Sequence, residues 1–381
     1  MKNIVILGST GSVGESAFRT ALAMQHEIRV LGIAGNTNLK RLGEQASALG
    51  CSFAVTGNGS AELLQKELPG TCKASAGIDA ICDLVCMPEV DLVLCAIVGI
   101  SSLPAVLAAI RAGKTIALAT KEILVMAGDL VMKEAEKNKV KIIPVDSEHS
   151  AVFQCLQGQG KSYSKIILTC SGGPFRTTPA ERLRDVKWAD AMNHPTWNMG
   201  EKVTLDSATL MNKALEMVEA HHLFSAPEDK IDVLIHPQSI VHSMVEFEDG
   251  ALIAHMSMPD MRFPVQYAFS WPERISAGLP SLNLAEIGML TFEKPDTARF
   301  PSLDFAREAI RRGGTAGAVM NAANEAAFFR FKNGTAGFTD IWKIVEKTME
   351  TVNWKDQDIT LNGILEADRE ARNFAAGIIL N

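Results

Sequence analysis

The sequence predicts an α/β protein: an N-terminal Rossmann-like parallel sheet, then an α+β catalytic and connective domain, then a C-terminal helical bundle. Three observations carry this prediction. The first part of the chain alternates short apolar segments with amphipathic ones, which is typical of parallel strands joined by helices. The middle contains a hairpin signal, and the residues after 301 have helical periodicity. A chain of 381 residues is also long enough for two or three domains.

The first domain is expected to contain six strands, each apolar throughout because helices cover both faces of a parallel sheet. These strands are Asn3–Leu7, Ile28–Ile33, Phe53–Val55, Asp91–Val98, Thr115–Leu118 and Lys141–Val145. The longest apolar stretch, from Val90 to Ile110, is interrupted by Asp91, Gly99 and Pro104. It therefore predicts a buried strand, a turn and a short helix rather than a membrane span.

The second domain is expected to combine a helix over Asp206–Phe224 with four strands. The strands are Lys165–Thr169, Asp232–Ile235, Ser239–Phe247 and Ala251–Met256, the last two joined by a hairpin turn at Glu248-Asp249-Gly250.

A proline-rich stretch from Trp271 to Pro301 has the composition of a linker. Helical patterns follow at Leu303–Arg312, Ala316–Lys332, Asp340–Val352 and Leu361–Ala376. The predicted domains are 1–146, which binds the cofactor, 147–270 for catalysis and dimerisation, a linker at 271–300, and a helical domain at 301–381.

Composition restricts the partners. The formal net charge is −7 without a basic block, which argues against nucleic acid or an acidic membrane surface. The seven cysteines are odd in number and include no C-x-x-C, so we expect reduced thiols in a cytoplasmic protein rather than a disulfide framework. The first residues do not resemble a signal peptide.

A glycine-rich turn, Gly8-Ser9-Thr10-Gly11-Ser12-Val13-Gly14, directly follows the first strand and opens a helix. Glycines at such a turn let the backbone approach a pyrophosphate, whose charge the helix N-terminus favours. The turn therefore predicts dinucleotide binding; its spacing is G-x-x-G-x-x-G. A purely structural turn is the alternative.

The end of the second strand indicates which dinucleotide is bound. NAD-preferring sites usually place an acid there to hold the ribose hydroxyl. Here the segment reads Ala34-Gly35-Asn36-Thr37-Asn38, with Lys40 and Arg41 just beyond. Because no carboxylate is present to repel a 2′-phosphate, the sequence favours NADP over NAD.

Two groups of residues suggest a metal site. Asp146 and Glu148 flank Ser147 at the end of a predicted strand, and in an extended segment residues i and i+2 point the same way. Farther along, Asn212, Lys213 and Glu216 share one face of a predicted helix. Oxygen ligands of this kind select Mg²⁺ or Mn²⁺ rather than zinc.

The same helix suggests a phosphate site, because Ser207 lies at its predicted start, where a hydroxyl and unpaired amides suit an anion. The alternative is ordinary: a Lys213–Glu216 pair on a solvated helix face, with Asp206 or Ser207 as an N-cap. Spacing alone does not decide between the two.

Two further segments are candidates. Lys121-Glu122 follows a predicted strand at the carboxyl edge, where open α/β sheets place their chemistry. The segment from His194 to Gly200 includes Trp197 and has the composition of a mobile lid, or else of a structured loop with a packed tryptophan. His221, His222, His236 and His242 are expected to be structural.

These motifs together resemble the 1-deoxy-D-xylulose 5-phosphate reductoisomerase family, over essentially the whole chain and in order. The resemblance is carried by GSTGSVG at Gly8, TKE at Thr120, PVDSEH at Pro144, SGGPFR at Ser171, HPTWNMG at His194, DSATLMNKALE at Asp206 and HPQSIVHSMV at His236.

The resemblance implies a set of roles. The divalent metal, Mg²⁺, Mn²⁺ or Co²⁺, would be held by Asp146, Glu148 and Glu216. The substrate would be bound by Lys121, Ser147, Glu148, Ser171, His194, Trp197, Ser207, Asn212, Lys213 and Glu216, of which Lys121, Glu148 and His194 would be catalytic. NADPH would be lined by Thr10, Gly11, Ser12, Val13, Asn36, Thr37, Asn38, Thr120, Glu122 and Gly200.

The implied reaction is a metal-assisted rearrangement of a sugar phosphate followed by reduction with NADPH, giving 2-C-methyl-D-erythritol 4-phosphate. Two other readings differ in class. An aspartate-semialdehyde-type dehydrogenase would require an activated cysteine, and only Cys155 and Cys170 are available. A non-catalytic NADP sensor would leave the three carboxylates unexplained. The apolar strands between His236 and Met258 further suggest a homodimer.

Overall fold

The computed structural model describes residues 1–159, 163–193, 200–353 and 359–380. The chain folds into two compact units. The first unit comprises Met1–Ile123, Val131–Phe153 and Asp260–Ser281, and the second comprises Leu124–Leu130, Gln154–Pro259 and Leu282–Asn381. The predicted fold class is confirmed, whereas the predicted domain boundaries remain a prediction.

The first unit is built on a seven-stranded parallel sheet in the order β4-β3-β2-β1-β5-β6-β7. Its strands are β1 (Lys2–Leu7), β2 (Ile28–Gly35), β3 (Phe53–Thr56), β4 (Lys73–Ala76), β5 (Leu92–Cys95), β6 (Thr115–Leu118) and β7 (Ile142–Pro144). The order reverses at β1, which pairs with β2 on one side and β5 on the other. Ligands of open α/β sheets bind at the carboxyl ends of the strands beside such a reversal.

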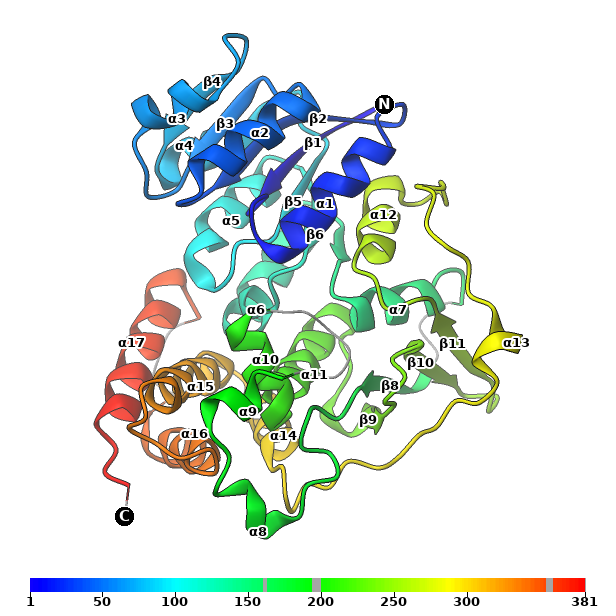
Figure 1. The fold of residues 1–381 in the computed structure, drawn as a ribbon, viewed down its shortest axis with the longest axis vertical. Coiled ribbons are helices and arrows are strands. Elements are labelled where there is room, and N and C mark those ends of the chain that lie inside the picture. Colours follow the sequence, from blue (N-terminus) through cyan, green and yellow to red (C-terminus); the bar gives the residue numbers. More distant parts are fainter. Residues whose placement is uncertain (160–162, 194–199, 354–358, 381) are drawn as a thin grey trace. The chain divides into compact units, whose positions relative to one another are not determined.

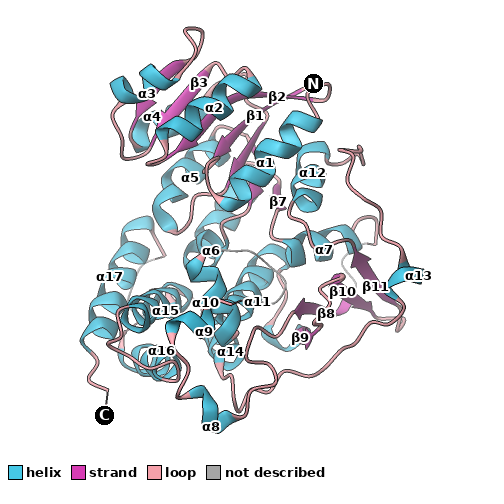
Figure 2. Ribbon diagram, in the orientation of Figure 1, coloured by secondary structure: helices cyan, strands magenta, loops and turns pink. Residues whose placement is uncertain are grey.

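Helices lie on both sides of this sheet (Figure 2). They are α1 (Ser12–Ala23), α2 (Leu39–Leu49), α3 (Ala61–Glu67), α4 (Ile78–Cys86), α5 (Leu103–Arg111), α6 (Lys121–Lys137), α7 (Ser147–Cys155) and α12 (Arg262–Ser270), with a 3₁₀ turn at Ile100–Ser102. Among them, α12 packs against α1 and α4 against α5. The middle of α6, from Leu124 to Leu130, is assigned to the second unit.

The sequence missed one strand. β4 (Lys73–Ala76) lies at an edge of the sheet, and its side chains are small or polar and only half-buried or exposed. An edge strand of this kind lacks the apolar run that marks a central parallel strand, so the pattern gave no signal. The six expected strands are all present, with ends shifted by a few residues.

The second unit contains a four-stranded mixed sheet in the order β11-β10-β8-β9. Its strands are β8 (Tyr163–Cys170), β9 (Ile231–Ile235), β10 (Val241–Phe247) and β11 (Leu252–Met256). β8 pairs with β9 in parallel and with β10 antiparallel. The antiparallel β10–β11 pair confirms the predicted hairpin. A small apolar core at this sheet joins Ile167, Val241 and Met244.

The remaining elements of the second unit are helical. They are α8 (Ala180–Leu183), α9 (Trp188–Ala191), α10 (Glu201–Thr209), α11 (Met211–Phe224), α13 (Leu284–Ile287), α14 (Ser302–Arg312), α15 (Ala316–Lys332), α16 (Asp340–Thr351) and α17 (Leu361–Gly377), with a 3₁₀ turn at Glu228–Lys230. α15 packs against both α16 and α17, and α14 packs against α11 (Figure 1). The predicted C-terminal bundle is confirmed.

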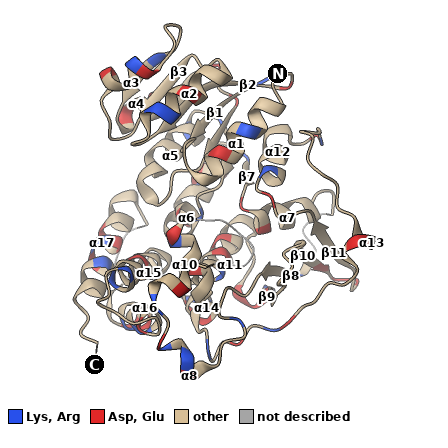
Figure 3. Cartoon of the chain, in the orientation of Figure 1, with Lys and Arg blue, Asp and Glu red and all other residues tan. Residues whose placement is uncertain are grey.

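None of the described helices is long and apolar enough to cross a membrane. Acidic and basic residues are interspersed along the chain rather than gathered in blocks of one sign (Figure 3). The stretch from Val90 to Ile110, considered above as a span, is instead β5, the 3₁₀ turn and α5, as predicted.

Close packing of helices in the second unit generates the first testable prediction. A β-carbon at Gly317 of α15 would lie 2.0 Å from the backbone oxygen of Val125, so Gly317→Ala forces the two backbones apart. We expect a loss of about 1–3 kcal/mol in the free energy of unfolding, measured by urea titration.

Gly377→Ala is the matched control. Gly377 also lies in a helix, but nothing lies within 4 Å of the added methyl group. Alanine there should leave the protein as stable as wild type or stabilise it by up to about 1 kcal/mol. Equal stability of the two variants would contradict the close approach at Gly317.

Candidate functional site

The glycine-rich turn of the first unit has the backbone geometry of a ligand cradle. Gly8 has φ +82°, and a β-carbon there would lie 2.5 Å from the Ala96 oxygen. A β-carbon at Gly14 would lie 2.1 Å from the oxygen of Gly8. The turn is closed by a hydrogen bond from the Gly11 amide to the Gly8 carbonyl, 3.0 Å. Only glycine fits at these positions, because the turn folds directly onto neighbouring backbone.

The first backbone amides of the helix that follows receive no side-chain cap from the N-cap residue. α1 begins at Ser12, and its N-cap residue, Gly11, has no side chain to accept from them. The first amides of a helix have no partner within the helix, and the helix dipole favours an anion there. Gly11 and Ser12 are exposed, and Thr10 and Val13 are half-buried. The turn therefore suits the pyrophosphate predicted for it.

The loop after β2 is ordered by its own side chains. Asn38 caps α2 by accepting from the Arg41 amide, and Asn36 accepts from the Asn58 amide at 2.9 Å. The Arg41 guanidinium is bound bidentately by Glu15, at 2.7 Å for each bond. Arg41 is thus committed to a structural pair, whereas Lys40 and Thr37 are exposed.

Thr120 follows β6, and its hydroxyl is committed to the backbone. It donates to the carbonyl oxygen of Ile97 at 2.8 Å and lies 3.4 Å from that of Cys95. The side chain is 4% exposed, so it fixes the loop after β5 against the loop after β6. Glu122, two residues on, is half-buried in the first turn of α6.

The carboxyl edge of β6 and β7 brings together two predicted site residues. The strands are parallel neighbours, with Leu118 opposite Pro144. The segments that follow β6 and β7 therefore leave the sheet at the same edge. The first leads to Lys121 and the second to Asp146. The Lys121 ammonium lies 2.6 Å from Asp146 Oδ2, with the two side chains 12% and 11% exposed.

Asp146 remains ionised in this setting. Burial alone would raise its pKa, but the Lys121 ammonium and the nearby His149 imidazole outweigh burial and hold the pKa well below its usual value. Nδ1 of His149 lies 3.9 Å from Asp146 Oδ1, and the imidazole is fully buried. Sequence reasoning gave His149 no role; its position three residues after Asp146 would have indicated the contact had a helix been expected there.

The expectation that Asp146, Ser147 and Glu148 form an extended segment is wrong. Ser147 and Glu148 open α7, and the Ser150 amide donates to the Asp146 carbonyl at 2.8 Å, so Asp146 stands at the N-cap. Aspartate is a preferred N-cap residue, a signal that the strand pattern before it concealed. Asp146 and Glu148 therefore share no strand face, and the Ser147 hydroxyl instead donates to Glu148 Oε2 at 2.5 Å.

In the second unit, the single predicted helix Asp206–Phe224 is two helices. α10 ends at Thr209, Leu210 adopts the left-handed conformation with φ 62° and ψ 9°, and α11 begins at Met211. No glycine or proline marks this break, so the periodicity could not show it. Ser207 consequently lies in the last turn of α10, and its predicted place at a helix start is wrong.

Ser207 nevertheless adjoins another predicted site segment. Gly173, with φ +69°, lies so close to α10 that a β-carbon would be 2.5 Å from the Ser207 carbonyl oxygen. The Gly173 amide in turn donates to the Ser171 hydroxyl at 3.3 Å. The glycine-rich loop after β8 thus packs directly against the end of α10.

α11 presents the other three predicted residues on one face, as expected. Glu216 accepts from Asn212 Nδ2 at 2.5 Å and forms an ion pair with Lys213. The alternative of a solvated surface pair is wrong, because Lys213 is 2% exposed and Glu216 is 1% exposed. Buried charges of opposite sign in contact are typical of a ligand site or a structural core pair.

Two predicted residues, His194 and Trp197, lie outside the described residues. Gly200 is described and caps α10 from an exposed position. Sequence reasoning also missed Asn324, whose amide donates to the buried Asp206 carboxylate at 3.0 Å. No sequence signal could have paired residues so far apart in the chain.

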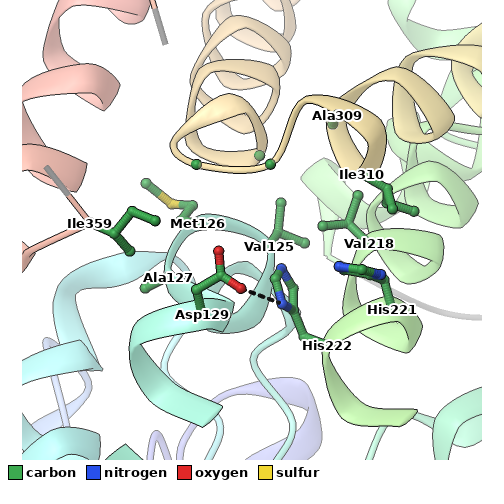
Figure 4. Close-up of a pocket in the computed structure, with 14 residues that line it drawn as sticks. Val125, Met126, Ala127, Asp129, Val218, His221, His222, Ala309, Ile310 and Ile359 are labelled. Carbon is green, nitrogen blue, oxygen red and sulfur yellow. Dashed lines mark ion pairs between the residues drawn. The ribbon is translucent and has the colours of Figure 1, made fainter. Parts of the chain in front are cut away.

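The second unit has a separate pocket, lined by α6, α11 and the Gly313-Gly314 turn (Figure 4). His222 points toward Asp129, with Nδ1 3.7 Å from Oδ1. Nδ1 of His221 lies 2.7 Å from the Ala226 carbonyl oxygen. Both histidines therefore have structural partners, in keeping with their prediction as structural residues.

The same holds for the strand histidines. Nε2 of His236 accepts from the Ile240 and Val241 amides, and Nδ1 lies 2.9 Å from the Thr291 carbonyl oxygen. His242 Nε2 lies 2.8 Å from the Ser257 hydroxyl. Both rings are buried and hydrogen-bonded within the second unit.

Comparison with known families covers most of the chain. The family described as 1-deoxy-D-xylulose 5-phosphate reductoisomerase matches residues 4–128. The 1-deoxy-D-xylulose 5-phosphate reductoisomerase C-terminal domain matches residues 142–224, and the DXP reductoisomerase C-terminal domain matches residues 256–374.

Individual relatives extend the likeness over the full length. The 1-deoxy-D-xylulose 5-phosphate reductoisomerase of Trichlorobacter lovleyi is 47% identical over 99% of this chain and 97% of its own. That of Pelotomaculum thermopropionicum is 48% identical over 100% and 99%. The solved Zymomonas mobilis enzyme in complex with NADPH is 40% identical, with a TM-score of 0.92 over 98% of each chain.

A second solved structure is of a DOX-P reductoisomerase in complex with NADPH, fosmidomycin and magnesium. It is 36% identical and covers 98% of this chain and 97% of its own, with a TM-score of 0.90.

The buried His222 generates a pH prediction. Burial and then the adjacent His221 imidazole lower its pKa from 6.5 to about 4, against the opposing effect of Asp129. Between these two values the unfolded chain binds a proton that the folded protein does not. Stability is therefore present above about pH 6.5 and is lost as the pH falls toward 4. His222→Gln should reduce the loss of unfolding free energy between about pH 7 and pH 5 by roughly 1–2 kcal/mol.

Urea titrations at the two pH values measure this difference. Val218→Ala is the control, because Val218 lines the same pocket and its substitution adds or removes no titratable group. It should lower the free energy of unfolding equally at both pH values. If His222→Gln keeps the wild-type dependence on pH, protonation of His222 does not contribute to acid destabilisation.

Proposed function

The chain belongs to the 1-deoxy-D-xylulose 5-phosphate reductoisomerase family, and from this premise we propose its substrate and reaction. It catalyses the NADPH- and divalent-metal-dependent conversion of 1-deoxy-D-xylulose 5-phosphate to 2-C-methyl-D-erythritol 4-phosphate. The observation that carries the proposal is identity of about 47% to reductoisomerases over the whole chain, since both the cofactor turn and the carboxylate residues fall within it.

The first unit fits NADPH. A β-carbon at Gly8 or Gly14 would clash with neighbouring backbone, so these glycines allow the tight turn, and the first amides of α1 suit a pyrophosphate. The loop after β2 has no carboxylate to repel a 2′-phosphate. We assign NADPH to Thr10, Gly11, Ser12, Val13, Asn36, Thr37, Asn38, Thr120, Glu122 and Gly200.

The proposed ligand set fits a divalent metal. It consists of Asp146, Glu148 and Glu216, all hard oxygen donors of the kind that Mg²⁺ and Mn²⁺ prefer. Asp146 forms an ion pair with Lys121 and Glu216 forms one with Lys213, so each carboxylate already interacts with a positive charge. When bound, the metal polarises the ketone and hydroxyl oxygens of the sugar, and NADPH supplies the hydride.

Lys121 and Glu148 act on the reacting part of the sugar in this proposal. Lys121 Nζ stands at the carboxyl edge of the sheet and can donate hydrogen bonds to a substrate oxygen. Glu148 accepts a hydrogen bond from the Ser147 hydroxyl, so the two side chains can exchange a proton or together orient a hydroxyl group of the substrate. His194 is proposed as a third catalytic residue, with Trp197 over the substrate.

The phosphate end of the substrate is assigned to the second unit. Ser171 and Ser207 belong to segments that pack directly on each other through Gly173. Asn212 and Lys213 follow on α11, and Lys213 supplies a buried positive charge for the phosphate.

Three further expectations concern the domain boundaries, the compartment and the oligomeric state. The domains are 1–146, 147–270 and 301–381, with a linker at 271–300. The compartment is the cytoplasm, in keeping with seven cysteines that are all free thiols. The enzyme is a homodimer, because β11 is an edge strand that carries the exposed Leu252 and is followed by the exposed Met258.

The reaction can be tested directly. Purified protein should oxidise NADPH when 1-deoxy-D-xylulose 5-phosphate and Mg²⁺ or Mn²⁺ are present, and should not do so without the metal. Glu216→Gln removes one proposed ligand charge, so the metal concentration for half-maximal activity should rise by about tenfold or more. The measurement is the initial rate of NADPH oxidation across a metal titration.

Glu228→Gln is the matched control, because it also removes a carboxylate of the second unit but one paired with Arg307 and Arg311. Its metal titration should match wild type. If the folded protein binds NADPH but shows no turnover, the proposed reaction is wrong. If Glu216→Gln has the metal titration of wild type, Glu216 is not a metal ligand.

The dimer predicts a mass of twice the 41.1 kDa chain in light scattering. Leu252→Lys places a charge on the exposed face of the edge strand and should shift the mass toward that of the monomer. Phe329→Lys changes a comparably exposed apolar residue on α15 and should leave the mass unchanged. A monomeric wild type would contradict the dimer.

A further inference from the structure

The break between α10 and α11 holds a leucine in a conformation that leucine avoids. Leu210 is 3% exposed and has φ 62°, where its β-carbon crowds the following carbonyl. Such backbone persists only when the surrounding structure over-determines it. Local bonds contribute, since the Ala214 amide donates to the Leu210 carbonyl at 3.0 Å and the Met211 amide to the Thr209 hydroxyl at 3.4 Å.

The carbonyl of Thr209, which lies immediately before the break, is bound by two residues from distant parts of the chain. The Ser302 hydroxyl of α14 donates to it at 2.7 Å. Nε1 of Trp342, on α16, lies 3.3 Å from the same carbonyl and 3.0 Å from the Ser302 hydroxyl oxygen. Thr209 and Ser302 are fully buried and Trp342 is 7% exposed, so no water competes for these bonds.

The Trp342 ring is itself fixed by aromatic contacts. Its ring centroid lies 5.8 Å from that of Phe300 and 5.4 Å from that of Phe338, both edge to face. Phe338 also contacts Phe175, at 5.1 Å, in the loop that contains Ser171. One aromatic cluster thus joins the C-terminal helices to the loop after β8.

The break determines how two parts of the proposed phosphate site are placed. Ser207 precedes Thr209 by two residues, and Asn212 follows Leu210 by two. A rotation at Leu210 would turn the start of α11 relative to the end of α10, and with it Lys213 relative to Ser207. The Thr209 carbonyl is the point at which the C-terminal helices can resist that rotation.

We infer that Trp342 and Ser302 are positioning residues for the substrate phosphate, acting through the Thr209 carbonyl to fix the break between α10 and α11. The inference rests on the proposed function, because it concerns the placing of Ser207, Asn212 and Lys213. It gives the C-terminal helical bundle a role in substrate binding although neither residue touches the substrate.

Steady-state kinetics of Trp342→Phe and Ser302→Ala test the inference. Phenylalanine keeps a buried ring but removes the N–H donor, and alanine removes the hydroxyl alone. Each variant should raise the KM for 1-deoxy-D-xylulose 5-phosphate by about 3- to 10-fold, while kcat and the KM for NADPH stay within about 2-fold of wild type. Ser302→Ala is the smaller change and serves if the tryptophan variant does not fold.

Thr348→Val is the matched control for a lost buried hydroxyl on α16. Thr348 is fully buried and donates to the Ile344 carbonyl at 2.7 Å, within its own helix. The variant should lose thermal stability yet keep the wild-type KM for the sugar phosphate. A purely structural role for Trp342 would make Trp342→Phe behave like this control.

A second readout does not depend on turnover. Inorganic phosphate at millimolar concentration should raise the melting temperature of wild type and of Thr348→Val, and should raise that of Trp342→Phe and Ser302→Ala clearly less. The inference is overturned if Trp342→Phe and Ser302→Ala both keep the wild-type KM for the sugar phosphate, or if both keep the wild-type rise in melting temperature with phosphate. Absence of wild-type turnover would instead overturn the proposed function, while the phosphate titration still decides the inference.

Discussion

The parallel pairing of β6 with β7 is the constraint on which the candidate site of the first unit depends. Parallel neighbours leave the sheet at the same edge, so the residues after Leu118 and after Pro144 must meet there. This is why Lys121 and Asp146, which are far apart in the chain, lie 2.6 Å from each other. Helix α6 and helix α7 both start at this edge, and their first residues are those assigned to the substrate and the metal.

Three carboxylates with little exposure to solvent are each paired with a lysine. Asp146 is paired with Lys121, Glu216 with Lys213, and Asp206 with Lys202. A carboxylate taken out of water is costly unless a cation or several donors compensate it. Lys121 helps to hold the pKa of Asp146 well below its usual value, so this proposed ligand is in the form that a divalent cation requires.

In the second unit, the proposed phosphate site depends on how three segments are placed: the loop after β8, the end of α10 and the start of α11. Close approach at Gly173 brings the loop after β8 against α10, and the left-handed Leu210 redirects the chain into α11. Ser302 and Trp342 support the left-handed Leu210 through the Thr209 carbonyl. Phe338 packs on Phe175 in the loop that contains Gly173. The helical bundle therefore contributes to the order of the site as well as to the stability of the unit.

The sequence by itself determined features that depend on near neighbours in the chain. Apolar runs between amphipathic segments identified six of the seven strands of the first sheet. The Gly8–Gly14 turn indicated a dinucleotide cradle, and three- and four-residue spacing placed Asn212, Lys213 and Glu216 on one helix face. The tertiary structure decided what neighbours could not. Asp146 proved to be an N-cap rather than part of a strand. Ser207 lies at the end of a helix because Leu210 breaks it, and that break is held by Ser302 and Trp342. A conformation that needs partners about a hundred residues away leaves no trace in local periodicity, because the energy that stabilises it comes from contacts that only the folded chain makes.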